Sequence, residues 1–200
     1  YTYYPGTQTV PENVAAKVLN RAHSITADVD IPKEGAEGVI VCHGSNVGGY
    51  TLFVKDKKLH YVHNYVGAEQ FHVESNAVVP AGKVRLRYEF EPTGKPDLAN
   101  GKGSPGKAQL YINDKPVGQL LLPYTVPLAL GLGSGVAVGR NPGSTISALY
   151  QPPFEFTGTI QIVTVDVSGK LLLDSKERDA ALAKVAMARR AGTGLRCGRS

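Results

Sequence analysis

The chain has 200 residues, of which 42% are hydrophobic and 20% charged, the composition of an ordinary soluble globular protein with one main domain. No apolar run approaches the ~20 residues that cross a bilayer. Residues 1–10 lack the basic and apolar regions of a signal peptide, so we expect no membrane partner and favour the cytoplasm over secretion. The net charge of +5 lies entirely in residues 176–200, and the balanced remainder argues against nucleic-acid binding.

The two ends of the chain differ in character from its middle. Residues 1–20 predict an extended apolar and aromatic leader that straps onto a neighbouring domain. Because the only methionine is Met187, we expect Tyr1 not to be an initiator and the chain to come from a longer polypeptide. We expect the folded domain over 21–173 and a basic helical tail over 174–200.

The first half of the chain shows the period-2 alternation of half-buried strands. The pattern is clean at 24–31 and at 83–91, where apolar side chains on one face alternate with polar or charged ones on the other. Runs at 50–55 and 59–66 flank Asp56-Lys57-Lys58, a break that predicts a hairpin. Shorter strands are expected at 38–43 and 70–74.

The second half continues in the same way. Strands at 108–112 and 117–122 flank the turn-forming sequence 113–116, and a short strand is expected at 135–139. A long β-prone stretch at 156–167 changes its apolar phase at Ile162-Val163, which predicts a bulge.

The tail predicts the only helix. Asp174 or Ser175 would be its N-cap, Leu182 and Val185 would share one side, and it would stop before Gly192.

These elements predict an all-β fold. Twenty-three glycines and thirteen prolines spread along the chain indicate many turns between short strands. Hairpins without alternating helices point to a sandwich or a barrel, and no repeat suggests a propeller. We therefore expect an antiparallel two-sheet, jelly-roll-like sandwich of the concanavalin or lectin kind, with a short C-terminal helix.

The two cysteines, Cys42 and Cys197, lie far apart in the sequence. A disulfide between them is not required by any pattern, and we expect Cys42 to be buried and reduced. Without neighbouring ligands they cannot form a four-ligand zinc site.

Three histidines could meet across neighbouring strands. His60, His63 and His72 carry imidazoles that bind transition metals, but His60 and His63 point to opposite faces of one strand. At most one of them can join His72, so we favour surface or packed histidines and predict no metal site.

A pair of carboxylates raises the question of glycoside hydrolysis. Glu89 and Glu91 lie on one strand face, about 7 Å apart, which suits the two carboxylates of a glycosidase. Arg85 and Arg87 share that face and would hold both acids ionised, which removes the general acid. We therefore favour a salt-linked solvent face and predict no catalytic residue.

Aromatic residues suggest a contact surface. Tyr61, Tyr65, Phe71 and Tyr88 could line a sugar groove or pack against another domain, although the chain has no tryptophan. The candidate surface for a glycan or a domain contact comprises Tyr61, His63, Tyr65 and His72.

Several short segments resemble one family in order. They are Tyr3-Tyr4-Pro5-Gly6, Pro11-Glu12, Asn20-Arg21, His23-Ser24-Ile25-Thr26-Ala27, Gly48-Gly49-Tyr50, Val54-Lys55-Asp56, Leu59-His60-Tyr61-Val62 and Phe156-Thr157-Gly158-Thr159-Ile160. Over residues 1–168 the chain resembles the C-terminal concanavalin-like β-sandwich domain of bacterial arylsulfatases. Lys57 stands where that family often has glycine.

This resemblance implies a non-catalytic role. Sulfatases of the family use calcium and a formylglycine made from a cysteine in Cys-x-Pro-Ser-Arg or Cys-x-Ala-Ser-Arg, and neither cysteine here has that context. The chain itself is expected to carry no cofactor and to be inactive alone. It would be an accessory domain whose partner is a sulfatase catalytic domain of the same polypeptide, stabilising it or shaping substrate access. The alternative is a stand-alone carbohydrate-binding module.

Overall fold

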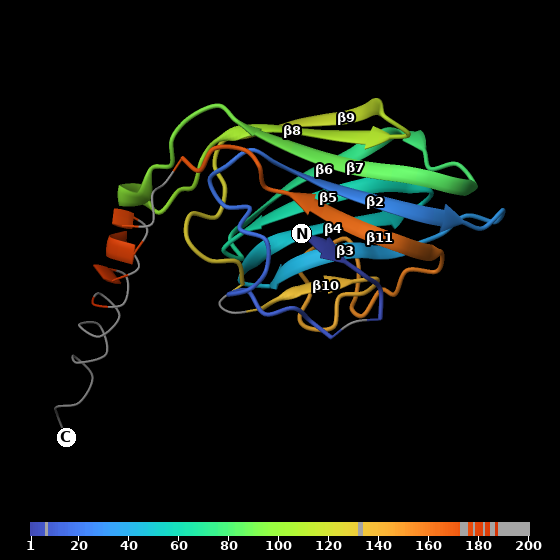
Figure 1. Cartoon of the computed structure of the whole chain (residues 1–200), viewed down its shortest axis with the longest axis horizontal. Helices are drawn as coiled ribbons and strands as arrows, with labels where there is room; N and C mark the ends of the chain where they lie inside the picture. Colours follow the sequence, from blue (N-terminus) through green and yellow to red (C-terminus); the bar gives the residue numbers. More distant parts are fainter. Residues whose placement is uncertain are drawn as a thin grey trace, which may run out of the picture.

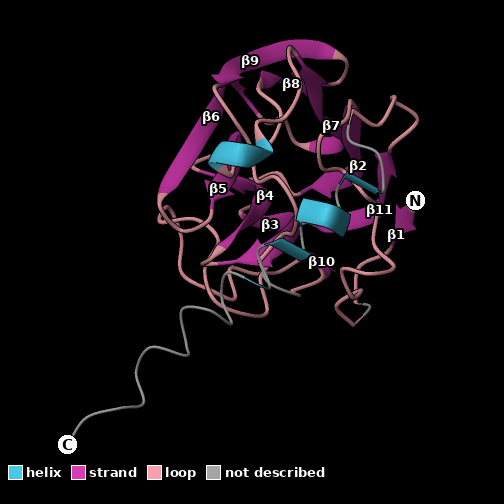
Figure 2. Ribbon diagram, turned by 90° about the vertical axis from the view of Figure 1, so that its left-hand side faces the viewer, coloured by secondary structure: helices cyan, strands magenta, loops and turns pink. Residues whose placement is uncertain are grey.

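The computed structural model shows a sandwich of two antiparallel sheets (Figures 1 and 2). It describes residues 1–6, 8–131, 134–172, 176–177, 179–181, 183–184 and 187. Within them lie one 3₁₀ turn, η1 (Leu98–Asn100), and eleven strands: β1 (Thr2–Tyr3), β2 (His23–Ile31), β3 (Gly38–Ser45), β4 (Gly48–Lys55), β5 (Lys58–Tyr65), β6 (Glu69–Val78), β7 (Gly82–Pro92), β8 (Gly106–Ile112), β9 (Lys115–Leu122), β10 (Val136–Val138) and β11 (Thr159–Asp166).

The six-stranded sheet has the order β1-β11-β2-β7-β8-β9, and the five-stranded sheet has the order β10-β3-β4-β5-β6. The expected all-β, jelly-roll-like sandwich is therefore confirmed. The phase change in the last strand is also confirmed, because the register of β11 against β2 shifts between Ile160 and Ile162.

The core between the sheets is built from the inward positions of the alternating strands. Ile25, Leu86 and Leu110 are completely buried, and the tyrosine rings of Tyr61 and Tyr88 stack with their centroids 3.7 Å apart. Tyr61 comes from the five-stranded sheet and Tyr88 from the six-stranded one, so this stacked pair joins the two layers.

The five-stranded sheet is also covered on part of its outer face, over β3, β4 and β5. The loop 139–158 covers it with Ile146, Tyr150 and Phe154, which pack against Val39, Phe53 and Val62. This explains why β3 and β4 lack a clear polar face, since strands buried on both sides need apolar residues on both. Cys42 lies in this second cluster as a buried free thiol, as expected, and burial raises its pKa to about 12.

The leader packs on the sandwich itself. Thr2 and Tyr3 pair with Thr164 and Val163 of β11, and Val10 donates its N–H to the carbonyl oxygen of Val136 at 2.8 Å. Tyr3, Ala15, Ala16 and Val18 are buried in the main core. The division of the chain at residues 20 and 173 stays a prediction.

The tail lies partly outside the described residues. Its described members, 176–177, 179–181, 183–184 and 187, are helical, in agreement with the expected helix. The expected N-cap at Asp174 or Ser175, the face with Leu182 and Val185, and the stop before Gly192 lie outside them, as does Cys197. No described helix is long and apolar enough to cross a membrane.

Both predicted hairpins turn more tightly than the sequence indicates. Asp56-Lys57 and Asn113-Asp114 form two-residue turns in which every residue has a positive φ, between 48° and 63°. Such turns match the twist of the flanking strands. Pro116 lies inside β9 rather than in the turn, which is tolerated because β9 is an edge strand.

The residue at position 57 provides a test of this turn. A left-handed backbone costs an L-residue about 1–2 kcal/mol, whereas glycine adopts it freely. Lys57 has a φ of 60°, so Lys57→Gly should relieve this cost. Because glycine also adds conformational entropy to the unfolded chain, the free energy of unfolding should rise by at most about 1 kcal/mol. Urea denaturation would measure it, with Lys83→Gly in β7 as the control that should destabilise. A lower stability of Lys57→Gly would contradict the turn.

Candidate functional site

A groove of about 480 Å³ lies on the outer face of the six-stranded sheet. This volume is in the range of about 300–1,000 Å³ that small-molecule sites occupy. Its lining comes from β2, β7 and β8 and from the chain around the end of β11: Ala22, His23, Ser24, Glu89, Phe90, Glu91, Lys107, Gln109, Tyr111, Asp166, Ser168 and Gly169.

Strand register aligns polar residues across this groove. Asp166 pairs with Ser24, Ser24 with Glu89, and Glu89 with Gln109, so four adjacent strands place these side chains in one row. Because residues directly opposite each other share a face, the row points outward like the polar half of each strand. The next pair along β7 and β8 is Glu91 with Lys107.

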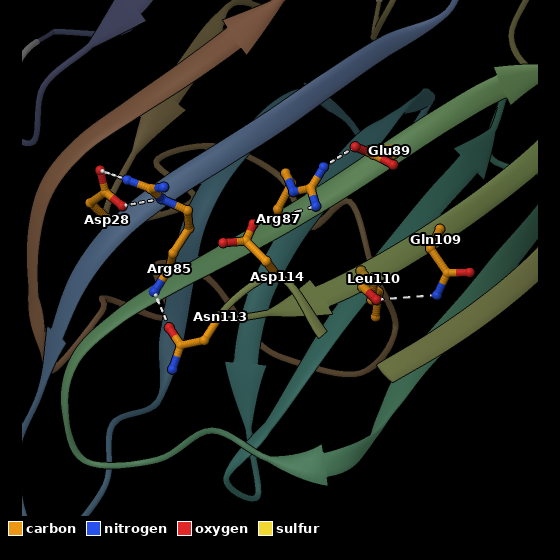
Figure 3. Close-up of polar contacts among 8 residues, drawn as sticks. All are labelled: Asp28, Arg85, Arg87, Glu89, Gln109, Leu110, Asn113 and Asp114. Atoms are coloured by element: carbon orange, nitrogen blue, oxygen red, sulfur yellow. Dashed lines mark hydrogen bonds and ion pairs between the residues drawn. The ribbon is translucent and has the colours of Figure 1, made fainter. Parts of the chain in front are cut away.

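The positions of two row members are set by hydrogen bonds. Gln109 donates its side-chain amide to the carbonyl oxygens of Leu110 and Gly118 at 3.2 and 2.6 Å, and its own amide oxygen therefore remains the acceptor (Figure 3). Asp166 accepts the N–H of Ser168 at 2.7 Å, which holds the pKa of that carboxyl below its usual range.

An ion-pair layer borders the groove on the same face. Arg87 pairs with Glu89 and lies 4.0 Å from the ring centroid of Tyr111, and Arg85 pairs with Asp28 at 2.9 Å (Figure 3). Burial and a hydrogen bond with Glu89 raise the pKa of Tyr111. The salt-linked face expected from the sequence is thus present around Arg85, Arg87 and Glu89. Because Glu89 is engaged by Arg87, Glu89 and Glu91 are not a free pair of carboxylates for glycoside hydrolysis.

The four residues expected to form a contact surface do not share one. Tyr61 and His63 are only 2% and 5% exposed and face the core, where His63 Nε2 accepts the N–H of Val126 at 3.0 Å. Tyr65 is half-buried and donates its hydroxyl to the carbonyl oxygen of Gly101 at 2.9 Å. The fourth residue, His72, is exposed on the opposite face of the sheet.

The physical reason is the facing of β5. Residues 61, 63 and 65 alternate onto its inner side, beneath the six-stranded sheet, so large aromatic side chains there fill the core. A cavity of about 20 Å³ beside Tyr61 and His63 has room for a water molecule but not for a sugar. Of the other expected aromatics, Tyr88 is buried in the same core and Phe71 is half-buried against Tyr124.

The histidines divide as the strand geometry predicts. His60 lies on the outer face, with its Nδ1 3.0 Å from His72 Nε2, whereas His63 lies on the inner face. Glu74, which the sequence did not associate with them, pairs with His60 across β5 and β6. These three residues offer ligand atoms that all lie within 4.8 Å of one another.

Comparisons with solved structures show the fold. The CBM40 of the Ruminococcus gnavus IT-sialidase, bound to α2,3-sialyllactose, matches at 12% identity with a TM-score of 0.51, over 81% of this chain and 82% of that one. A leech intramolecular trans-sialidase complexed with 2,7-anhydro-Neu5Ac matches at 14% identity with a TM-score of 0.52, over 90% of this chain and 26% of that one. Domains LG4-5 of the mouse laminin α1 chain match at 12% identity with a TM-score of 0.50, over 84% of this chain and 39% of that one.

No family model matches the chain, and no curated protein matches it in sequence. At such low identities the structural matches show a concanavalin-like or lectin-like β-sandwich and nothing finer. None of the comparisons supports an arylsulfatase parent, so that parentage and a sulfatase partner stay predictions.

Proposed function

We propose that this chain is a non-catalytic carbohydrate-binding module whose ligand lies in the groove over β2, β7 and β8. The observation that carries the proposal is the row of Asp166, Ser24, Glu89 and Gln109 beneath a groove of about 480 Å³. A row of acceptors on adjacent strands of one sheet suits a ligand that presents several hydroxyl donors along one edge. Similarity in fold to a module solved with sialyllactose supports the same class of ligand.

The charges of the lining favour a neutral sugar. Glu89, Glu91 and Asp166 contribute three carboxylates, whereas Lys107 contributes the one lining cation among the described residues. Arg87 is already paired with Glu89 and Asp114. An acidic sugar would therefore meet like charge, which costs affinity, while sugar hydroxyls would donate to the carboxylates.

Tyr111 gives the groove an apolar wall. Its ring is half-buried and contacts the Arg87 guanidinium, so its orientation is restricted before any ligand arrives. Tyrosine combines a flat apolar ring with a hydroxyl, which suits the mixed surface of a sugar. The proposed glycan surface thus lies on the opposite sheet from Tyr61, His63 and Tyr65.

Glycan-array screening followed by calorimetry tests this function. We expect binding to neutral oligosaccharides such as lactose and weaker binding to α2,3-sialyllactose. Gln109→Ala and Tyr111→Ala should each weaken binding by about 3–10-fold, the equivalent of one net hydrogen bond or ring contact of about 1 kcal/mol. Lys83→Ala, on the same face of β7 but outside the groove lining, is the matched control and should bind like wild type.

Two results would contradict the proposal. A glycan array without any binding would contradict the carbohydrate-binding function and favour the accessory-domain hypothesis. Equal losses in Lys83→Ala and Gln109→Ala would remove the groove as the site. A preference for sialyllactose over lactose would overturn the charge argument and leave the groove itself in place.

A further inference from the structure

The outer face of the five-stranded sheet holds a cluster of three potential metal ligands. His60 on β5 lies opposite Glu74 on β6, and His72 is two residues before Glu74 on the same strand face. His60 Nδ1 and His72 Nε2 are 3.0 Å apart, and one ligand atom from each of the three residues, a carboxylate oxygen included, lies within 4.8 Å of the other two. Two imidazoles and one carboxylate are a ligand set that suits Zn²⁺, Cu²⁺ and Ni²⁺.

His60 is held with a defined nitrogen facing the cluster. Its Nε2 lies 3.1 Å from the carbonyl oxygen of Lys55. A carbonyl can only accept, so Nε2 carries the proton and Nδ1 of the neutral ring presents its lone pair to His72. This is the arrangement of metal-binding histidines, which donate their second ring N–H to a backbone carbonyl or a carboxylate.

Packing fixes the His60 ring further. It stacks on Phe53 with ring centroids 4.9 Å apart and an interplanar angle of 5°, and it is 5% exposed. His72 and Glu74 are exposed, so an ion and its water ligands could reach the cluster from solvent.

Two contacts compete with metal binding, namely the hydrogen bond between His60 Nδ1 and His72 Nε2 and an ion pair at Glu74. Lys58 pairs with Glu74 at 2.7 Å, and both side chains are substantially exposed, at 36% and 48%. An exposed pair of this kind contributes little to stability, so a divalent cation could replace the ammonium at little cost. Lys58 thereby offers a variant that should change metal affinity in the opposite direction from loss of a ligand.

We propose that His60, His72 and Glu74 form a binding site for a divalent transition-metal ion of the Zn²⁺ class, with water completing its coordination. The site joins β5 to the edge strand β6 on the sheet opposite the glycan groove, so it is independent of the proposed function. An ion bound only by the folded chain would also raise the stability of this edge.

Calorimetry with Zn²⁺ alone tests the site in a chain without a histidine tag and with Cys197→Ser, which removes the second thiol. We expect one ion per chain. His72→Ala should weaken binding by at least the 10–100-fold that loss of a ligand's supporting partner costs. Glu74→Gln should weaken it less, and Lys58→Met should strengthen it by up to about fivefold, the equivalent of about 1 kcal/mol. Glu69→Gln, a carboxylate change elsewhere on β6, is the control and should leave the affinity unchanged.

An independent spectroscopic measurement identifies the ligands. The electron paramagnetic resonance spectrum of the Cu²⁺-loaded chain should show coupling to two imidazole nitrogens in wild type and to one in His72→Ala. The site is supported by this change together with the calorimetric order of the variants. Wild-type affinity in His72→Ala, or no binding at 1 mM Zn²⁺, would overturn it. Circular dichroism of His72→Ala shows whether the variant is folded, and that is expected because His72 is exposed.

Discussion

Acidification from pH 7 to pH 5 is expected to lower the free energy of unfolding by about 4 kcal/mol through His43 and His63 alone, because the fold buries both rings in their neutral form. Burial and then the charge of Lys17 lower the pKa of His43 to about 4, and burial followed by the charge of His23 lowers that of His63 to about 3. Both rings are nearly inaccessible, at 2% and 5% exposure. In the unfolded chain each histidine would titrate near 6.5.

The sign follows from proton binding. Below about pH 6.5 the unfolded chain takes up a proton on each ring while the folded chain does not, so acid favours unfolding. The stability is complete above pH 6.5 and is lost as the pH falls toward 4. At pH 5 the loss is about 2 kcal/mol for each ring. Against a typical total of about 5–15 kcal/mol, this is a large share.

Urea denaturation at pH 7, 6 and 5 measures this dependence. His63→Gln keeps an acceptor for the Val126 N–H and should reduce the loss between pH 7 and pH 5 by about 2 kcal/mol. His72→Gln changes an exposed histidine and should reduce it far less. Equal unfolding free energies of the wild type at pH 7 and pH 5 would show that the two rings are not buried as neutral groups.

Tyr61→Ala is expected to lower the free energy of unfolding by about 4 kcal/mol, the usual cost of removing a large buried ring. Tyr61 is 2% exposed and stacks between Tyr88, at 3.7 Å, and Tyr50, at 6.2 Å. Its ring therefore spans the interface of the two sheets. The loss comprises the buried apolar area, the cavity left behind and the ring contacts.

Two further variants separate a core role from a surface role for Tyr61. Tyr61→Phe keeps the ring and should cost about 1 kcal/mol for the lost hydroxyl interaction with Tyr88. Tyr65→Ala removes a half-buried ring at the end of the same strand and should cost less than Tyr61→Ala. Guanidinium denaturation provides the measurement. A loss below 1 kcal/mol in Tyr61→Ala would be incompatible with the stacked core.

The half-buried strands were predictable because the alternation of apolar and polar residues in each one indicates which face is buried. β2 and β7 alternate apolar and charged residues, and the structure places the charged residues outward as expected. β1 was not predictable, because a strand of only two residues is too short to show an alternation of apolar and polar side chains. The cover provided by Tyr150 and Phe154 was also missed, because turn-rich sequence indicates a loop but not the surface on which it packs.

The candidate sites depended on register, which sequence alone does not contain. Glu89 was assigned to the correct face, but its neighbours Asp166 and Gln109 come from distant strands and meet only through pairing. In the histidine cluster the two-faced geometry correctly separated His60 from His63. The third ligand, Glu74, was missed because the register that pairs it with His60 across β5 and β6 is not contained in the sequence.

The leader has a consequence for association between molecules. Open sheet edges expose unpaired N–H and C=O groups, and these recruit strands from other chains. In this fold one short N-terminal segment covers an edge of each sheet. Thr2 and Tyr3 pair with β11 of the six-stranded sheet, and Val10 forms backbone hydrogen bonds with Val136 of the five-stranded sheet. At the opposite side β9, an edge strand interrupted by Pro116, lies beside the edge strand β6. We therefore expect residues 1–6 and 8–10 to hinder edge-to-edge aggregation of the sandwich.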